Sequence, residues 1–267
     1  MPISYFIVFL GYSAAAYVLS LHVGFHSGRR ASRWLTVLVI CTVLLLHVGA
    51  LYQGVLRDDG MHLGFINMLS LVAWLMAFPS LLLIGQVSVQ RFNVAVLALI
   101  TIVMGGLALA SDWSEPIAIT ASMGLRIHIV VSLIGYSLLG LAALLAVFVW
   151  LQDRLLKTGH PGLLIRFVPP LWTIEKLLFR LIITGFALLT VALASGFLYL
   201  DNIFDQHLVH KTVFSCLAWL GFGVLLMGRR YYGWRGKKAV NWTLLAYVSL
   251  MISYFGSKFV LEILLSH

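Results

Sequence analysis

Five histidines of this 267-residue chain stand where they could bind a metal ion or a haem iron. His62, His128, His207 and His210 lie near one end of long apolar runs, and His47 lies inside such a run. Neutral imidazole is a frequent metal ligand and a regular axial ligand of haem. The spacing does not match a structural zinc motif, and cysteine ligands are absent there. Haem suits these side chains better, because an apolar helix bundle can cover the macrocycle and supply histidines from facing helices.

The composition determines which elements must position these histidines. Hydrophobic residues make up 61% of the chain and charged residues 10%, with a mean hydropathy of +1.01. Soluble domains carry about 25% charged residues, so a soluble enzyme, a disordered chain and a secreted disulfide scaffold are excluded. The sequence predicts an all-α, polytopic membrane helix bundle in one integral-membrane domain, residues 1–267. Eight transmembrane helices are expected at 2–22, 34–55, 66–84, 92–110, 127–150, 178–200, 211–228 and 241–264.

The basic residues orient these spans. All but four of the 18 lysines and arginines fall on one side of the eight-span alternation, and the exceptions are Arg57, Arg126, Lys211 and Lys258. Short cytoplasmic loops accumulate lysine and arginine, so both termini are expected outside the cytoplasm. The net charge of +9 is therefore a signal of topology and does not indicate a nucleic-acid partner.

The membrane interior is nearly free of charge. Away from their ends, the spans contain no Asp, Glu, Lys or Arg, which disfavours an ion-coupled transporter or proton pump. No nucleophile and base are paired there, so no catalytic residues are predicted. Cys41 and Cys216 lie in apolar runs, and the chain has no CxxCH motif that would attach haem covalently. His47 lies about 12 Å below the outer end of its span, either as a functional group or as a neutral histidine bonded to a neighbouring helix.

Four short segments carry a resemblance to a known family. They run from Arg126 through His128 to Tyr136, from His210 to Trp219, over the GWRGKKA loop at 233–239, and over the YFG at 254–256. In this order and on consistent sides they resemble the cytochrome c assembly (CcsA/HemX-type) haem-handling membrane proteins. The likeness is greatest to the YpjD-like inner-membrane branch.

The resemblance implies non-covalent haem b, cytochrome c-type biogenesis and a multi-pass location in the bacterial cytoplasmic (inner) membrane. Expected partners are membrane lipid, haem, and another membrane protein of cytochrome biogenesis or a neighbouring transporter. Family members that act as complete cytochrome c synthases carry a Trp-rich outer loop, whereas residues 200–210 contain no Trp. The histidine expected late in the seventh helix is replaced by Met227 and Gly228. A complete synthase is therefore not predicted.

His47 and His128 are the predicted iron ligands, and His210 is the alternative outer ligand. Tyr136 lies two turns below His128 on nearly the same face, either to pack or to hydrogen-bond a ligand or propionate. Arg126 and Lys211 stand where haem propionates would emerge, although cations at a membrane interface also snorkel without any ligand.

Two other functions stay open at this point. A non-catalytic accessory or scaffold subunit, with or without haem, would be colourless if it lacks haem and would co-purify with a partner. An electron-transfer subunit linked to quinone would show a reversible haem potential.

Overall fold

A computed structural model describes residues 2–25, 30–57, 60–62, 64–86, 89–110, 118–119, 123–157, 171–199 and 206–256. Within these ranges six helices are long and apolar enough to cross a membrane, which confirms the predicted polytopic helical bundle. Contacts within the chain gather into two compact units, Met1–Thr120 and Ala121–His267. The orientation of the termini and the assignment to one domain stay predictions.

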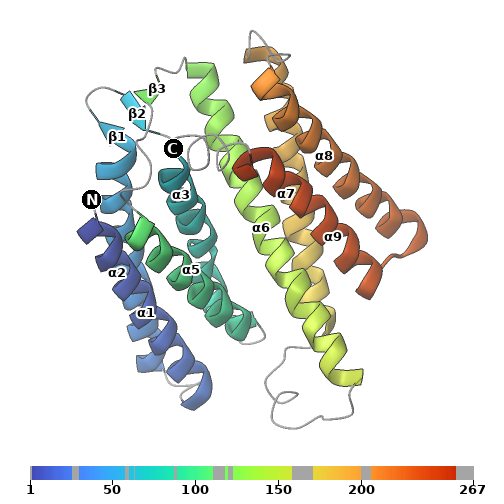
Figure 1. Ribbon diagram of the computed structural model, residues 1–267. Coiled ribbons are helices and arrows are strands. Elements are labelled where there is room, and N and C mark those ends of the chain that lie inside the picture. Colours follow the sequence, from blue (N-terminus) through green and yellow to red (C-terminus); the bar gives the residue numbers. More distant parts are fainter. Residues whose placement is uncertain are drawn as a thin grey trace. The chain divides into compact units, whose positions relative to one another are not determined.

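The first unit is a ring of four helices, shown in blue to green in Figure 1: α1 (Pro2–Phe25), α2 (Arg30–Val55), α3 (Phe65–Ala77) and α5 (Gln90–Ala110). α1 packs against α2 and α5, and α3 completes the ring by packing against the same two helices. Tyr12, Ile40 and Leu97 are almost fully buried in its centre. Leu38, Leu45 and Ile102 are exposed, as expected for apolar side chains that face lipid.

The third expected span is broken. Instead of one helix over 66–84, α3 ends at Ala77 and the short α4 (Pro79–Leu83) follows after Phe78. Pro79 has no N–H to continue the hydrogen-bond ladder of α3, and its ring clashes with the preceding turn, so the helix is interrupted there.

A small antiparallel sheet was not predicted from the sequence. Its strands β1 (Leu56–Arg57), β2 (Gly60–His62) and β3 (Ala118–Ile119) pair in the order β1-β2-β3. Leu56 lies opposite Met61, and Met61 lies opposite Ile119. The sheet joins the end of α2 to the segment that follows α5.

The second unit is also a four-helix ring: α6 (Met123–Lys157), α7 (Leu171–Tyr199), α8 (Gln206–Tyr232) and α9 (Gly236–Met251). Each helix packs against the next, and α9 packs back against α6. α7 begins well before its predicted start at 178. α9 passes into the π-helix η3 (Ile252–Gly256), and the remainder of the expected last span, 257–264, lies outside the described residues.

The GWRG turn between α8 and α9 is fastened to α7. Gly233 and Gly236 have φ angles of 63° and 52°, a conformation that glycine adopts without strain. The backbone N–H of Gly236 donates to Oε1 of the buried Glu175 at 3.0 Å. The N–H of Trp234 donates to the Gly228 carbonyl at 3.2 Å, and its indole stacks on Trp242. The turn is thus a fixed connection.

Replacing Gly236 by alanine is expected to lower the free energy of unfolding by about 1–2 kcal/mol, because a Cβ is disfavoured at positive φ. The measurement is thermal unfolding of the detergent-solubilised protein, followed by tryptophan fluorescence. Gly106→Ala is the matched control, since a Cβ at this exposed site in α5 meets nothing within 4 Å. Equal melting temperatures for the two variants would contradict the strained-turn interpretation.

Candidate haem-binding site

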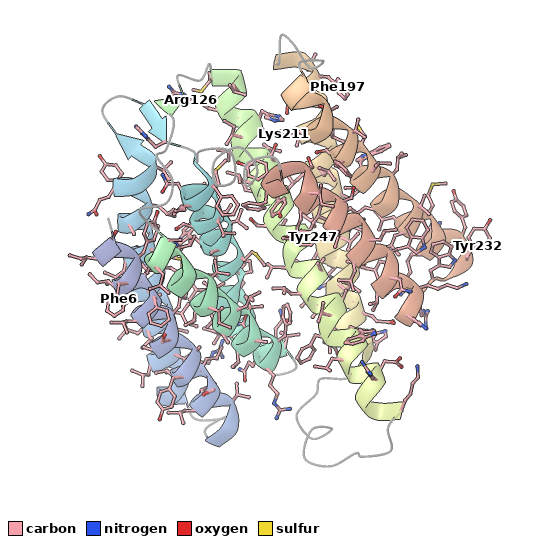
Figure 2. All side chains as sticks on the ribbon, viewed as in Figure 1. Phe6, Arg126, Phe197, Lys211, Tyr232 and Tyr247 are labelled. Carbon is pink, nitrogen blue, oxygen red and sulfur yellow. The ribbon has the colours of Figure 1, made fainter. Side chains whose placement is uncertain are left out.

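His47 is fully buried at the meeting point of three helices. Its Nδ1 lies 2.9 Å from the hydroxyl of Tyr12 on α1, and its Nε2 lies 2.9 Å from the hydroxyl of Ser70 on α3. A neutral imidazole donates through one nitrogen and accepts through the other, so Tyr12 and Ser70 take opposite roles. Both ring nitrogens are therefore occupied, and the ring ties α2 to its two neighbours. Figure 2 shows how densely side chains fill this unit.

His128 is held differently, near the start of α6 in the second unit. The ring is half-buried, and its Nδ1 lies 2.9 Å from the hydroxyl of Ser195 on α7. Ser195 donates its only hydroxyl proton to the carbonyl of Ala192 at 3.0 Å. With that proton on the Ala192 carbonyl, the Ser195 oxygen accepts from His128 and the ring carries its proton on Nδ1; in the other tautomer Ser195 donates to Nδ1 instead.

This assignment has a chemical consequence. A neutral histidine protonated on Nδ1 presents the lone pair of Nε2, which is the atom that can coordinate a metal. Within the described residues, Nε2 of His128 makes no side-chain hydrogen bond. Metal-binding histidines are commonly oriented in this way, by donating their second ring N–H to a neighbouring group. The surroundings of His128 thus suit a haem ligand.

Tyr136 lies two turns further along α6 in an aromatic cluster. Its ring centroid is 5.5 Å from that of Tyr247 on α9 and 5.4 Å from that of Phe255 in η3. The side chain is buried, and its hydroxyl faces that of Tyr247 without reaching good hydrogen-bond geometry. The ring is thus well packed, and its polar atom has at most a weak partner in the described part of the chain.

Replacing Tyr136 by phenylalanine is expected to raise the melting temperature of the haem-free protein slightly. The substitution removes a buried hydroxyl that is poorly bonded, with Tyr247 as its neighbour, and keeps the ring contacts; a fully unsatisfied group of this kind costs about 1–3 kcal/mol. If the hydroxyl binds a haem group, the same variant lowers haem affinity. A loss of stability without haem would show that the hydroxyl is already satisfied in the fold.

The remaining predicted residues are spread over two helices of the second unit. Arg126 is exposed in the first turn of α6, two residues before His128. Lys211 is half-buried in α8, and its carbonyl accepts a hydrogen bond from Ser253 at 2.7 Å. Both residues take part in further contacts. His210 lies in the early part of α8, and its side chain is outside the described set.

The sequence reasoning missed Tyr12, Ser70 and Ser195, which contact the two histidines. No group of three or more His, Cys, Asp or Glu side chains that could hold a metal ion occurs among the described residues. Among these residues an iron would find one or two histidines, which is the number that haem uses.

Fold and site together define a polytopic helical membrane protein with two histidines positioned by hydroxyl groups. The profile of the family described as Cytochrome C assembly protein matches residues 43–265. The chain is 30% identical to the inner membrane protein YpjD of Escherichia coli K12 over 85% of each chain. It is also 30% identical to an uncharacterized 28.8 kDa protein of Azospirillum brasilense, over 96% of this chain and 84% of that one.

A shorter match joins the chain to a cytochrome c biogenesis protein CcsA of Gloeobacter violaceus. These two are 29% identical over 34% of this chain and 27% of that one. No solved structure matches. The chain belongs to the cytochrome c assembly protein family, which confirms the resemblance seen in its motifs and indicates a role in cytochrome c biogenesis. The family implies haem handling by a multi-pass membrane protein.

Proposed function

We propose that the protein binds haem b non-covalently and holds or passes it during cytochrome c maturation in the bacterial inner membrane. His128 is the proposed axial ligand in the second unit; the sequence predicts His47 of the first unit as its counterpart, with His210 as the alternative. The observation that carries the proposal is the 2.9 Å contact between Nδ1 of His128 and the Ser195 hydroxyl, an arrangement in which Nδ1 as donor would make Nε2 the coordinating atom. Bound haem would supply an iron centre that accepts imidazole nitrogens.

The second ligand requires an exchange of partners. Nδ1 and Nε2 of His47 are bonded to Tyr12 and Ser70, so the ring must give up one hydrogen bond to coordinate iron. Losing a neutral hydrogen bond costs about 0.5–1.5 kcal/mol, which a coordinate bond can offset. Arg126 and Lys211 are proposed to bind the propionates through charge-assisted hydrogen bonds, and Tyr136 offers its poorly bonded hydroxyl to a polar group of the ligand.

The proposed activity is to hold or transfer haem; the protein is not proposed to be a complete cytochrome c synthase. Support comes from residues 200–210, which contain no tryptophan, and from Met227 and Gly228 at the end of α8, where synthases have a histidine. The match to the CcsA of Gloeobacter violaceus covers 27% of that protein, which is consistent with the two chains sharing one part of the sequence and not the whole.

A non-catalytic accessory subunit is the second candidate function. The saturated hydrogen bonding of His47 favours it, because this ring is already fully used in holding three helices together. Such a subunit, with or without haem, would co-purify with a membrane partner.

Genetic complementation tests the biological role. Deleting the gene in its own bacterium is expected to lower the amount of covalently bound haem c in membranes, measured by haem staining of denaturing gels. The wild-type gene and Ser132→Ala should restore it, and His128→Ala should not. Unchanged haem c after deletion would overturn the proposed role in maturation.

A further inference from the structure

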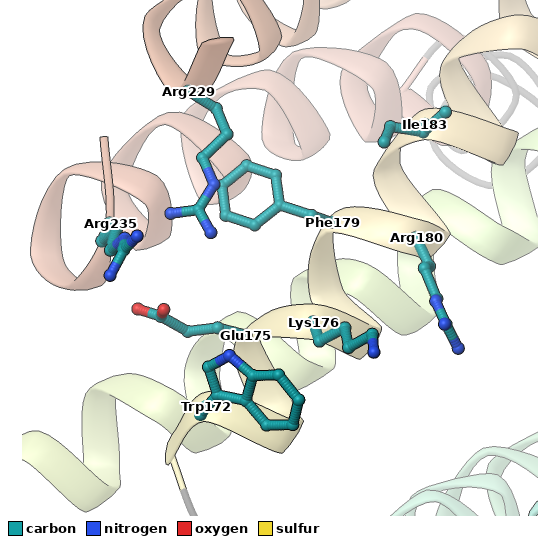
Figure 3. A pocket seen from close by; sticks show the side chains of 8 residues that line it. All are labelled: Trp172, Glu175, Lys176, Phe179, Arg180, Ile183, Arg229 and Arg235. Carbon is teal, nitrogen blue, oxygen red and sulfur yellow. The ribbon is translucent and has the colours of Figure 1, made fainter. Parts of the chain in front are cut away.

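A pocket of about 360 Å³ lies beside α7 in the second unit, far along that helix from Ser195. It is lined by three apolar and five charged side chains (Figure 3): Trp172, Phe179, Ile183, Glu175, Lys176, Arg180, Arg229 and Arg235. Four of the charged residues are cations and one is an acid. In the sequence the four cations served as signals of topology, and Arg235 also belongs to the GWRG motif.

The single carboxylate is occupied by the turn between α8 and α9. Glu175 is buried and accepts the Gly236 backbone N–H at 3.0 Å. Figure 3 shows Lys176 and Arg180 extending away from this carboxylate along α7. In the described part of the chain, none of the four cations forms a salt bridge. The pocket therefore has an excess of positive charge that an anion can neutralise.

Two of the cations are already fixed in place. The guanidinium of Arg229 lies 4.5 Å from the Phe179 ring centroid and donates to the Trp234 carbonyl at 3.2 Å. The ammonium of Lys176 lies 4.9 Å from the Trp172 ring centroid. An anion would meet positioned donors here, which reduces the entropy lost on binding.

The apolar wall identifies the kind of anion. One face of α7 carries two apolar and two basic side chains at helical spacing over about 16 Å: Trp172, Lys176, Arg180 and Ile183. Trp172 is 69% exposed and Ile183 is 55% exposed, although both lie in a membrane-spanning helix. This order of side chains, from tryptophan through cations to a lipid-facing isoleucine, suits a lipid, whose headgroup would meet the cations and whose acyl chains would meet the isoleucine. A fully soluble anion would make no use of the apolar residues.

We propose that this pocket binds an anionic phospholipid of the membrane leaflet on this side, which the basic loops assign to the cytoplasm. The phosphate binds Lys176 and Arg180, which extend to the same side of α7 (Figure 3), and an acyl chain follows Ile183.

Native mass spectrometry of the full detergent-purified chain tests the proposal. Phosphatidylglycerol and phosphatidylcholine with the same acyl chains are titrated separately, and bound lipid is counted. We expect phosphatidylglycerol to bind in preference. The double variant Lys176→Gln with Arg180→Gln should weaken its binding about 25-fold, since each cation near the surface contributes about fivefold. Both side chains are exposed, so the fold should persist.

The matched control carries Arg230→Gln and Lys237→Gln, two exposed cations on the same side of the second unit that do not line the pocket. It should bind phosphatidylglycerol as the wild type does. Three results would overturn the proposal: equal binding of the two lipids to the wild type, an equal loss in the control, or full displacement of phosphatidylglycerol by excess inorganic phosphate, which would indicate a soluble anion.

Discussion

Replacing His128 by alanine is expected to remove haem from the purified protein. Iron would lose the ligand whose Nε2 is left available by the Ser195 hydrogen bond. The fold should survive, because the ring is only half-buried and Ser195 stays bonded to Ala192. The measurement is the ratio of Soret absorbance to protein, together with a melting curve. Exogenous imidazole should restore the Soret band in His128→Gly, where the side-chain space is vacant.

Ser195 on α7 and Ser132, one turn after His128 on α6, provide a matched pair. Ser195→Ala removes the acceptor that orients the ring, and is expected to weaken haem binding about 10–100-fold. Ser132→Ala removes a hydroxyl that bonds only to the backbone carbonyl of His128, at 2.7 Å, and should leave haem binding unchanged. Equal losses in the two variants would show that the ring orientation is not what matters.

Replacing His47 by leucine is expected to destabilise the first unit strongly. The Tyr12 and Ser70 hydroxyls are fully buried, and each unsatisfied polar group costs about 1–3 kcal/mol. Ser70 can turn to the backbone carbonyl one turn earlier in α3, which leaves the Tyr12 hydroxyl and reduces the sum to about 1–3 kcal/mol. Thermal unfolding in detergent measures the loss, and Tyr12→Phe serves as a milder comparison.

A triple variant separates the structural role of His47 from its proposed role as a ligand. Tyr12→Phe and Ser70→Ala, combined with His47→Leu, remove all three polar partners together, which can be nearly neutral for stability. We expect the triple variant to recover most of the melting temperature lost by His47→Leu. If it also keeps haem with two axial nitrogen ligands, judged by its optical and electron paramagnetic resonance spectra, His47 is not a ligand and His210 takes its place.

Much of the fold could be predicted because lipid exposure demands long apolar helices. Hydropathy correctly predicted a membrane span at each of the six long helices, which are α1, α2, α5, α6, α7 and α8. The exceptions have local causes. Pro79 divides the third span, and a short sheet forms at Leu56–Arg57 and Gly60–His62, where the strands are too short to show a period-two pattern.

The site could be predicted only in part. His47 and His128 stood out because histidine is rare in apolar helices. Their partners Tyr12, Ser70 and Ser195 come from other helices, and a serine in an apolar run gives no signal of the helix it faces. The link between Glu175 and Gly236 was hidden for the same reason, because its two residues lie on α7 and at the start of α9.

The central claim is that this chain binds haem b without a covalent link. Its most direct test is the absorption spectrum and pyridine haemochrome of the detergent-purified wild-type protein, expressed with added haem. The account predicts a Soret band and a b-type haemochrome, with the haem extracted by acidified acetone. A wild-type protein that stays colourless under these conditions would contradict it, and would favour the accessory subunit instead.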